Sequence, residues 1–223
     1  MLDSIFDHIF EQLFAHYGEP PEPPGDSPWE RIAAAALMQR AAPAAVATAL
    51  SSLRETELLD PHSVLEIDPE ELAELLEPAG ATRQAAGRLR KLAGWLIEKH
   101  EGDAAHALDL DAETLRAELA EINGIGRATA DALILHAARK PVFAVDRAAH
   151  RVFKRHGWFD FDADDDELKS SVEASLRHAP RRLTELHELI AQVGRDYCGS
   201  RPRCDDCPLA ELLPEGGPRE PEL

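Results

Sequence analysis

The chain has few of the features that mark secreted, membrane-bound or disulfide-rich proteins. Of its 223 residues, only three are cysteine and 5% are aromatic. No apolar run approaches the length of a membrane span, so we expect no membrane partner. Residues 1–10 carry acids where a secretory signal peptide would have a basic head, and we therefore expect a cytoplasmic protein.

Basic residues are outnumbered: 24 Lys and Arg face 42 Asp and Glu, giving a net charge of −18. This bulk charge argues against a nucleic-acid partner, because DNA-binding proteins usually carry a basic surface. The acids concentrate in 55–77 and 160–173, however. The Lys and Arg residues between 127 and 155 predict a local basic face on this acidic protein, with a solvated helix surface as the alternative. These residues are Arg127, Arg139, Lys140, Arg147, Arg151, Lys154 and Arg155.

Strand-like alternation of apolar and polar residues is nearly absent, and helical periodicity takes its place. Apolar residues such as Leu89, Leu92 and Leu96 recur with a period near 3.6. Ser-Pro-Trp-Glu at 27–30 combines an N-cap, a first-turn proline and a glutamate placed for a capping box. The fold class is therefore predicted to be all-α. Further N-cap candidates are Asp60, Asp68 and Asp111.

Residues 122–131 contain two glycines, Gly124 and Gly126, separated by one isoleucine and flanked by helical patterns. Glycine allows a tight turn, and the start of the second helix offers unpaired N–H groups at the positive end of the helix dipole. Such a helix–hairpin–helix can hold a DNA phosphate through backbone N–H groups without reading sequence. A plain turn between packed helices is the alternative interpretation.

The hairpin is followed by an apolar helix, by Pro-Val-Phe-Ala-Val-Asp at 141–146 and by Arg-Val at 151–152. This order resembles the helix–hairpin–helix glycosylases of base excision repair, the endonuclease III superfamily. The hairpin sequence at 124–135 is most similar to the endonuclease III-related branch that includes 3-methyladenine glycosylases. The resemblance covers most of the chain.

The resemblance implies two helical domains that flank a DNA-binding cleft. Residues 27–138 would form a helical bundle with the hairpin motif at 119–137. Residues 1–26 and 139–210 would form a discontinuous domain that ends in a cysteine loop at 198–207. The proline- and glycine-rich residues 211–223 are predicted to be a disordered tail.

Asp146 is the candidate catalytic residue. In the superfamily the matching aspartate stabilises the positive charge that develops on the sugar as the N-glycosidic bond breaks, and it can orient a water. An aspartate between an extended segment and a helix is also an ordinary N-cap. The two roles are compatible.

The resemblance also implies DNA contacts. Gln39 matches the family's DNA-inserting glutamine, with an exposed polar residue on an alanine-rich helix as the alternative. Trp29 and Trp95 are candidates for stacking on a flipped base or for the core. The remaining predicted DNA-binding residues are Gly124, Gly126, Arg127, Thr129 and Arg151.

Two departures from the family pattern bear on the reaction. Ala128 stands where bifunctional members carry a lysine that forms a Schiff base, so base release by water without strand cleavage is predicted. Lys140 and Lys154 lie nearby in sequence, but nothing places either at the sugar. Ala148 replaces a histidine of the main branch, which predicts a different base pocket. An alkylated purine is the leading substrate, followed by uracil or thymine mispairs and adenine mispairs.

All three cysteines, Cys198, Cys204 and Cys207, lie within ten residues. Their clustering favours thiolate ligation over a disulfide in a cytoplasmic protein. The layout resembles the superfamily's [4Fe-4S] loop, but the first gap is one residue shorter and Leu213 stands where a fourth cysteine is expected. Three outcomes are open: a cluster with a non-cysteine fourth ligand, a different metal such as zinc, or a lost site.

Together these patterns predict a monofunctional DNA glycosylase that acts as a monomer on double-stranded DNA containing a damaged or mismatched base. The alternative is a non-catalytic DNA-binding or damage-sensing protein. The presence of Asp146 favours the enzyme, because a pure DNA binder gains nothing from an acid beside phosphates. The ten histidines show no metal-ligand spacing and are predicted to be surface or core residues.

Overall fold

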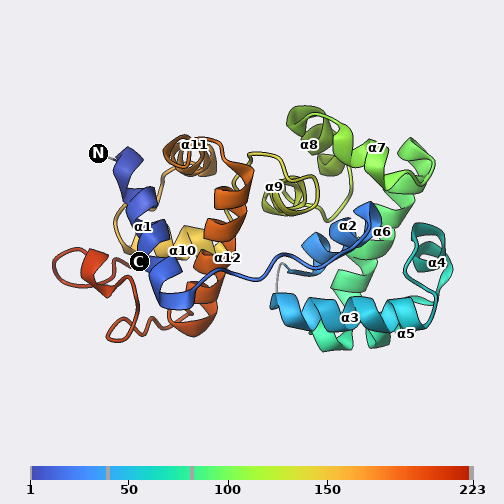
Figure 1. Ribbon diagram of the computed structural model, residues 1–223, viewed down its shortest axis with the longest axis horizontal. Helices are drawn as coiled ribbons and strands as arrows, with labels where there is room; N and C mark the ends of the chain where they lie inside the picture. The colour runs from blue at the N-terminus through green and yellow to red at the C-terminus, as the bar shows by residue number, and fades with distance from the viewer. Residues whose placement is uncertain (1, 39–40, 81–82, 221–223) are drawn as a thin grey trace. The chain divides into compact units, whose positions relative to one another are not determined.

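The computed structural model describes residues 2–38, 41–80 and 83–220. Within these ranges the chain is helical, and the only β feature is an isolated bridge between Cys198 and Pro202 (Figure 1). The predicted all-α class is confirmed. None of the helices in these ranges combines the length and the apolar character that a membrane span requires. The chain divides into two compact units, 21–140, here called the inner unit, and 1–20 with 141–223, the terminal unit.

The inner unit is built around its longest helix, α6. Helices α2, α4, α5 and α7 all pack against α6, whose Leu89, Leu92 and Leu96 are completely buried (Figure 1). The elements of this unit are α2 (Pro28–Met38), α3 (Pro43–Glu55), α4 (Pro61–Glu66), α5 (Pro69–Leu75), η1 (Glu77–Ala79), α6 (Arg83–His100), α7 (Ala104–Asp109), α8 (Ala112–Ala120) and α9 (Arg127–His136).

The three predicted aspartate caps are confirmed. The carboxylates of Asp60, Asp68 and Asp111 each accept two backbone N–H groups in the first turn of α4, α5 and α8. An aspartate here satisfies donors that have no partner inside the helix. Short helices of six to nine residues depend on such caps, because their intrinsic stability is marginal.

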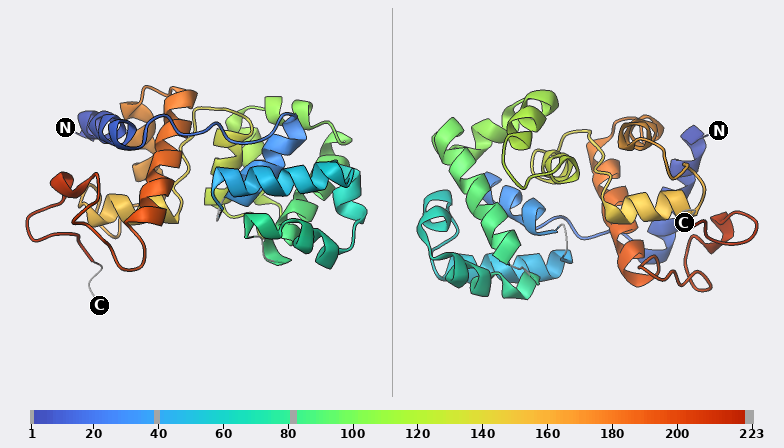
Figure 2. Two further views of the ribbon diagram at one scale, coloured as in Figure 1. Left: turned by 60° about the horizontal axis from the view of Figure 1, so that its bottom comes forward. Right: turned by 180° about the vertical axis from the view of Figure 1, so that it is seen from behind.

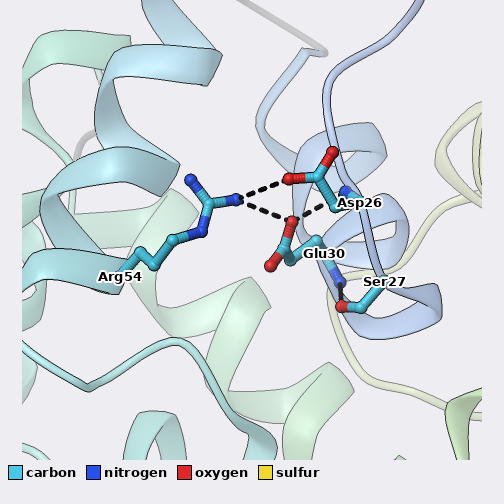
Figure 3. A network of polar contacts seen from close by, with 4 residues as sticks. All are labelled: Asp26, Ser27, Glu30 and Arg54. Carbon is cyan, nitrogen blue, oxygen red and sulfur yellow. Dashed lines mark hydrogen bonds and ion pairs between the residues drawn. The ribbon is translucent and has the colours of Figure 1, made fainter.

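The start of α2 carries a modified capping box (Figure 3). Ser27 Oγ accepts the N–H of Glu30 at 3.2 Å, as the sequence predicts. The Glu30 carboxylate accepts the N–H of Asp26 at 2.7 Å, one residue before the position expected for a standard box. Arg54 from α3 pairs with Glu30 at 2.9 Å and with Asp26 at 3.3 Å. The cap therefore also fixes α3 against the start of α2.

The terminal unit joins the N-terminal helix to the later part of the chain. Helix α10 packs against α12, and α1 packs against α11 and α12 (Figure 2). Phe6 of α1 meets Phe153 edge-on with ring centroids 5.2 Å apart, and Phe143 stacks on Phe153 at 6.1 Å. The elements are α1 (Leu2–Tyr17), α10 (Arg147–Arg155), α11 (Asp165–Ser175), α12 (Pro180–Asp196) and η2 (Ala210–Leu212).

The C-terminal segment makes contacts that its composition does not indicate. The backbone N–H of Arg219 donates to the carbonyl of Arg155 at 2.8 Å. Its guanidinium pairs with Asp160 at 3.1 Å and lies over the ring of Phe161. The expectation of a disordered tail from residue 211 did not anticipate this attachment to α10 and the loop that follows it.

Candidate functional site

The hairpin lies between α8 and α9 in the inner unit. Gly124 has a φ of +92°, a conformation that L side chains rarely adopt, so glycine is required there. Gly126 has an ordinary φ of −81°, and a Cβ atom added to it would meet nothing within 4 Å. The backbone at 126 therefore does not require glycine, and the glycine there leaves open space at the hairpin tip. The N–H of Ile125 donates to the carbonyl of Ile122 at 2.9 Å and closes the turn.

An ion pair joins the two helices that carry this turn. Arg116 Nε of α8 lies 2.7 Å from Asp131 Oδ1 of α9, and the Asp131 side chain is only 5% exposed. A buried carboxylate is costly without a cationic partner, so the pair favours one relative placement of the two helices. Leu115 and Leu119 of the same helix α8 are buried. The ion pair thus fixes the two helices that flank the hairpin tip.

The start of α9 has the features of an anion site. Gly126 is its N-cap and has no side chain to accept a first-turn N–H group. The backbone N–H groups and the helix dipole in this turn favour a negatively charged partner. Arg127 is exposed, and Ala128 and Thr129 are half-buried in the same turn. The predicted DNA contacts of Gly124, Gly126, Arg127 and Thr129 therefore gather at one tip.

Asp146 lies in the terminal unit, after a buried segment at 142–145 that has no regular secondary structure. Its Oδ1 atom accepts the N–H groups of Ala148 at 2.9 Å and Ala149 at 2.8 Å, so the predicted cap of α10 is confirmed. Its Oδ2 atom takes no part in the cap, and the side chain is 26% exposed. Oδ1 therefore fixes the carboxylate, and Oδ2 is left outside the cap in a side chain that is partly exposed.

His187 of α12 is the neighbour of that second oxygen, with Nε2 3.9 Å from Asp146 Oδ2. Burial lowers the pKa of His187, but hydrogen bonding to Glu188 and the negative charge of Asp146 outweigh burial and raise the pKa above its usual value. Asp146 and Glu188 therefore both favour the protonated form of His187. This role of His187 could not be read from the sequence, since nothing in the histidine spacing links α12 to the start of α10.

The alanine at 148 has a packing explanation. A Cβ atom added to Gly194 of α12 would lie 2.7 Å from the Cβ atom of Ala148, so α10 and α12 already approach as closely as small residues allow. Ala148 is buried in this contact. A histidine at 148 would require the two helices to separate. The departure from the main endonuclease III pattern therefore follows from the helix packing in this chain.

The three cysteines are unpaired thiols that line one pocket together with Leu213. Burial raises the pKa of the Cys204 and Cys207 thiols, and the neighbouring thiols raise it further. Arg155 Nη1 donates to Cys198 Sγ at 3.5 Å. These residues fit three corners of a cluster site. Leu213, where a fourth cysteine is expected, has no ligand atom.

The structure corrects the predicted basic face. Lys154 is 2% exposed and donates to the carbonyls of Phe161 at 2.6 Å and Ala163 at 3.2 Å. Arg155 is 7% exposed and donates to the Gly199 carbonyl at 2.7 Å. Both cations lie on the packed side of α10, where carbonyl groups satisfy them. They cannot contribute to an exposed DNA-binding surface.

Arg151 is also engaged with the cysteine loop. Its Nε atom donates to the Cys198 carbonyl at 2.9 Å, and the residue is half-buried. A phosphate contact through its remaining N–H groups stays a prediction.

The other predicted DNA contacts have different outcomes. Gln39 lies outside the described residues. Trp29 and Trp95 are both buried, and Trp95 Nε1 donates to Glu118 Oε2 at 3.1 Å, so both belong to the core.

Comparison with known proteins gives a consistent set of relatives. The family model for the HhH-GPD superfamily base excision DNA repair protein matches residues 33–178. A protein of Methanocaldococcus jannaschii, named as a candidate DNA repair glycosylase, is 32% identical over 205 residues, covering 92% of this chain and 93% of that protein. Endonuclease III of Bacillus subtilis is 29% identical over 196 residues, covering 87% and 84%. A solved non-covalent endonuclease III–DNA complex has a TM-score of 0.68 at 26% identity and covers 96% of each chain.

The contact between α10 and α12 predicts opposite effects for two glycine substitutions. Gly194→Ala should lower the free energy of unfolding by about 1–2 kcal/mol, because overpacking outweighs the roughly 1 kcal/mol that alanine gains in a helix. Gly87→Ala in α6 is the matched control. A Cβ atom there meets nothing within 4 Å, so a gain of about 0.5–1 kcal/mol is expected. Urea denaturation measures both, and a stabilising Gly194→Ala would contradict the packing explanation of Ala148.

Proposed function

The chain belongs to the HhH-GPD superfamily of base excision DNA repair proteins, and we propose that within it the chain is a monofunctional DNA glycosylase. Its substrate would be double-stranded DNA containing a damaged or mismatched base, bound by one copy of the chain. One observation carries the proposal: the partly exposed Asp146 carboxylate is fixed through Oδ1, while Oδ2 takes no part in the cap and lies 3.9 Å from His187 Nε2.

The proposed reaction is hydrolysis of the N-glycosidic bond. As the bond between sugar and base breaks, its electron pair leaves with the base and positive charge develops on the sugar. The Asp146 carboxylate stabilises this charge and accepts a proton from the attacking water. Because its orientation is fixed by two backbone N–H groups, little reorganisation is needed during the reaction.

An alkylated purine is the proposed substrate. Ring alkylation gives the base a positive charge, so it leaves as a neutral group and needs less assistance than a normal base. A single carboxylate without a lysine nucleophile suits such a substrate. The branch resemblance of the hairpin supports the same choice, with uracil or thymine mispairs and adenine mispairs as the next candidates.

The alternative is a DNA-binding protein without turnover. Ala148 gives it no support, because the contact with Gly194 accounts for that alanine by packing alone. Asp146 would have no role beyond the cap in such a protein. We therefore retain the enzyme as the proposed function.

For the cysteine pocket we propose a [4Fe-4S] cluster with three protein thiolates, from Cys198, Cys204 and Cys207, in a structural role. Such a cluster would brace the loop between α12 and η2. Arg151 and Arg155 already hold this loop through the carbonyls of Cys198 and Gly199, so its path does not depend on metal alone. No step of base release passes through this pocket.

The cluster proposal is tested by metal content. Protein purified without oxygen should be brown and contain both iron and sulfide, and Cys204→Ser should lose most of both while remaining folded. Elemental analysis, sulfide assay and visible absorption give the readouts. A wild-type chain that is fully folded, colourless and free of iron would contradict the proposal, and zinc in its place would assign the pocket to a different metal.

The role of Asp146 is tested by removing its charge. Asp146→Asn keeps an oxygen for the N–H groups of Ala148 and Ala149 but lacks the negative charge, so base release should fall by about two orders of magnitude or more while DNA binding persists. Asp164→Asn is the matched control, because Asp164 caps α11 in the same unit. Alkali-cleavage assays measure the rate. Unchanged base release in Asp146→Asn would refute the assigned role.

The absence of a lyase step is tested by borohydride trapping. The wild type should form no covalent adduct with a substrate duplex, and strand breaks should require alkali, since Ala128 offers only a methyl group. Ala128→Lys restores an amine at the start of α9 and should yield trapped adduct, whereas Ala128→Met, of similar length without an amine, should not. Efficient trapping by the wild type would sink the monofunctional assignment. Lys154 is a poor alternative nucleophile, because two carbonyl groups bind its amine.

A further inference from the structure

A groove of about 690 Å³ runs along α6 in the inner unit and reaches Asn123 of the hairpin. Three cations line it, Arg90, Lys91 and Lys99. Arg90 donates to the carbonyl of Ile67. Lys99 Nζ lies 2.6 Å from the carboxylate of Glu121, which neutralises its charge. Arg90 and Lys99 are therefore both engaged in contacts within the inner unit.

Lys91 differs from both. Among the described residues no carboxylate forms an ion pair with it, and its side chain is exposed. Its Nζ atom donates to the Asn123 carbonyl at 2.7 Å and lies 3.6 Å from the place where a Cβ atom of Gly124 would be. The ammonium group thus lies directly at the hairpin tip. An ammonium has three N–H donors, and the Asn123 contact uses one.

We propose that Lys91 of α6 binds a DNA phosphate together with the hairpin. Its ammonium group holds the Asn123 carbonyl with one N–H and binds a DNA phosphate oxygen with the others, beside the backbone N–H groups of the turn. This inference rests on the proposed function, because it requires the hairpin to contact DNA.

The charge balance of the chain supports this role. A net charge of −18 repels DNA at long range, so affinity must come from cations placed at the contact itself. Lys154 and Arg155 are buried against carbonyl groups and are lost to that purpose. Lys91 brings a full positive charge to the open tip, where the dipole of α9 contributes only a partial one.

A purely structural role is the competing interpretation of the Asn123 contact. Lysines often bind the last carbonyl groups beyond a helix, and Lys91 could do no more than stabilise the turn after α8. The two roles differ in one observable. Phosphate binding releases counterions from DNA, so it appears in the salt dependence of affinity, whereas a structural hydrogen bond within the protein does not.

The test measures binding of a duplex of fixed sequence over a range of salt concentrations. Lys91→Met should reduce the slope of log K against log salt by about one and weaken binding about tenfold at low salt. Lys91→Arg should behave like the wild type. Lys91→Gln keeps a donor for the Asn123 carbonyl without the charge, so it should lose the same slope as Lys91→Met.

Lys99→Met is the matched control, because it removes a lysine from the same helix whose charge Glu121 already neutralises. Its slope should equal that of the wild type, and the melting temperature of every variant shows whether it is folded. A wild-type slope in folded Lys91→Met, or restoration by Lys91→Gln, would overturn the inference and leave the proposed function standing. A wild type that does not bind duplex DNA would overturn both.

Discussion

The hydrogen bonds between Asp146 and the first turn of α10 determine where the proposed chemistry can occur. Two backbone N–H groups hold Oδ1 and thereby fix the direction in which Oδ2 points. The same two residues, Ala148 and Ala149, are buried where α10 packs in the terminal unit. Because Gly194 lets α12 come this close, His187 of the same helix lies 3.9 Å from Oδ2. Cap, helix packing and the charge beside the carboxylate therefore depend on one another.

Because Asp and Glu outnumber Lys and Arg in this chain, each cation placed at a DNA contact matters for affinity. Lys154, Arg151 and Arg155 of α10 donate to backbone carbonyls, which organises the cysteine loop and the segment after α10. These contacts leave fewer positive charges for DNA than the sequence indicates. In the proposed complex the hairpin would compensate by binding phosphate through backbone N–H groups and the helix dipole, which add no net charge. Lys91, if it binds phosphate as we propose, adds the full charge that those groups lack.

Features encoded locally could be predicted from the sequence. The all-α class followed from apolar periodicity, and the caps at Asp60, Asp68 and Asp111 followed from an aspartate placed directly before a helical pattern. Asp146 as the cap of α10 belongs to the same group. At each cap the aspartate side chain satisfies N–H groups two or three residues away, so no knowledge of tertiary structure is needed.

Features that depend on contacts between distant segments escaped prediction. His187, Lys91 and the Arg116–Asp131 pair reach their partners only through helix packing. The basic face was wrong for Lys154 and Arg155, because a sequence cluster does not reveal which side of a helix is buried.

The proposed glycosylase activity is measured with a panel of duplexes that each carry one lesion, with abasic sites detected by alkaline cleavage. We expect base release from the duplex that contains an alkylated purine. If the protein binds these duplexes tightly but releases no base from any of them, it is not a glycosylase for these lesions.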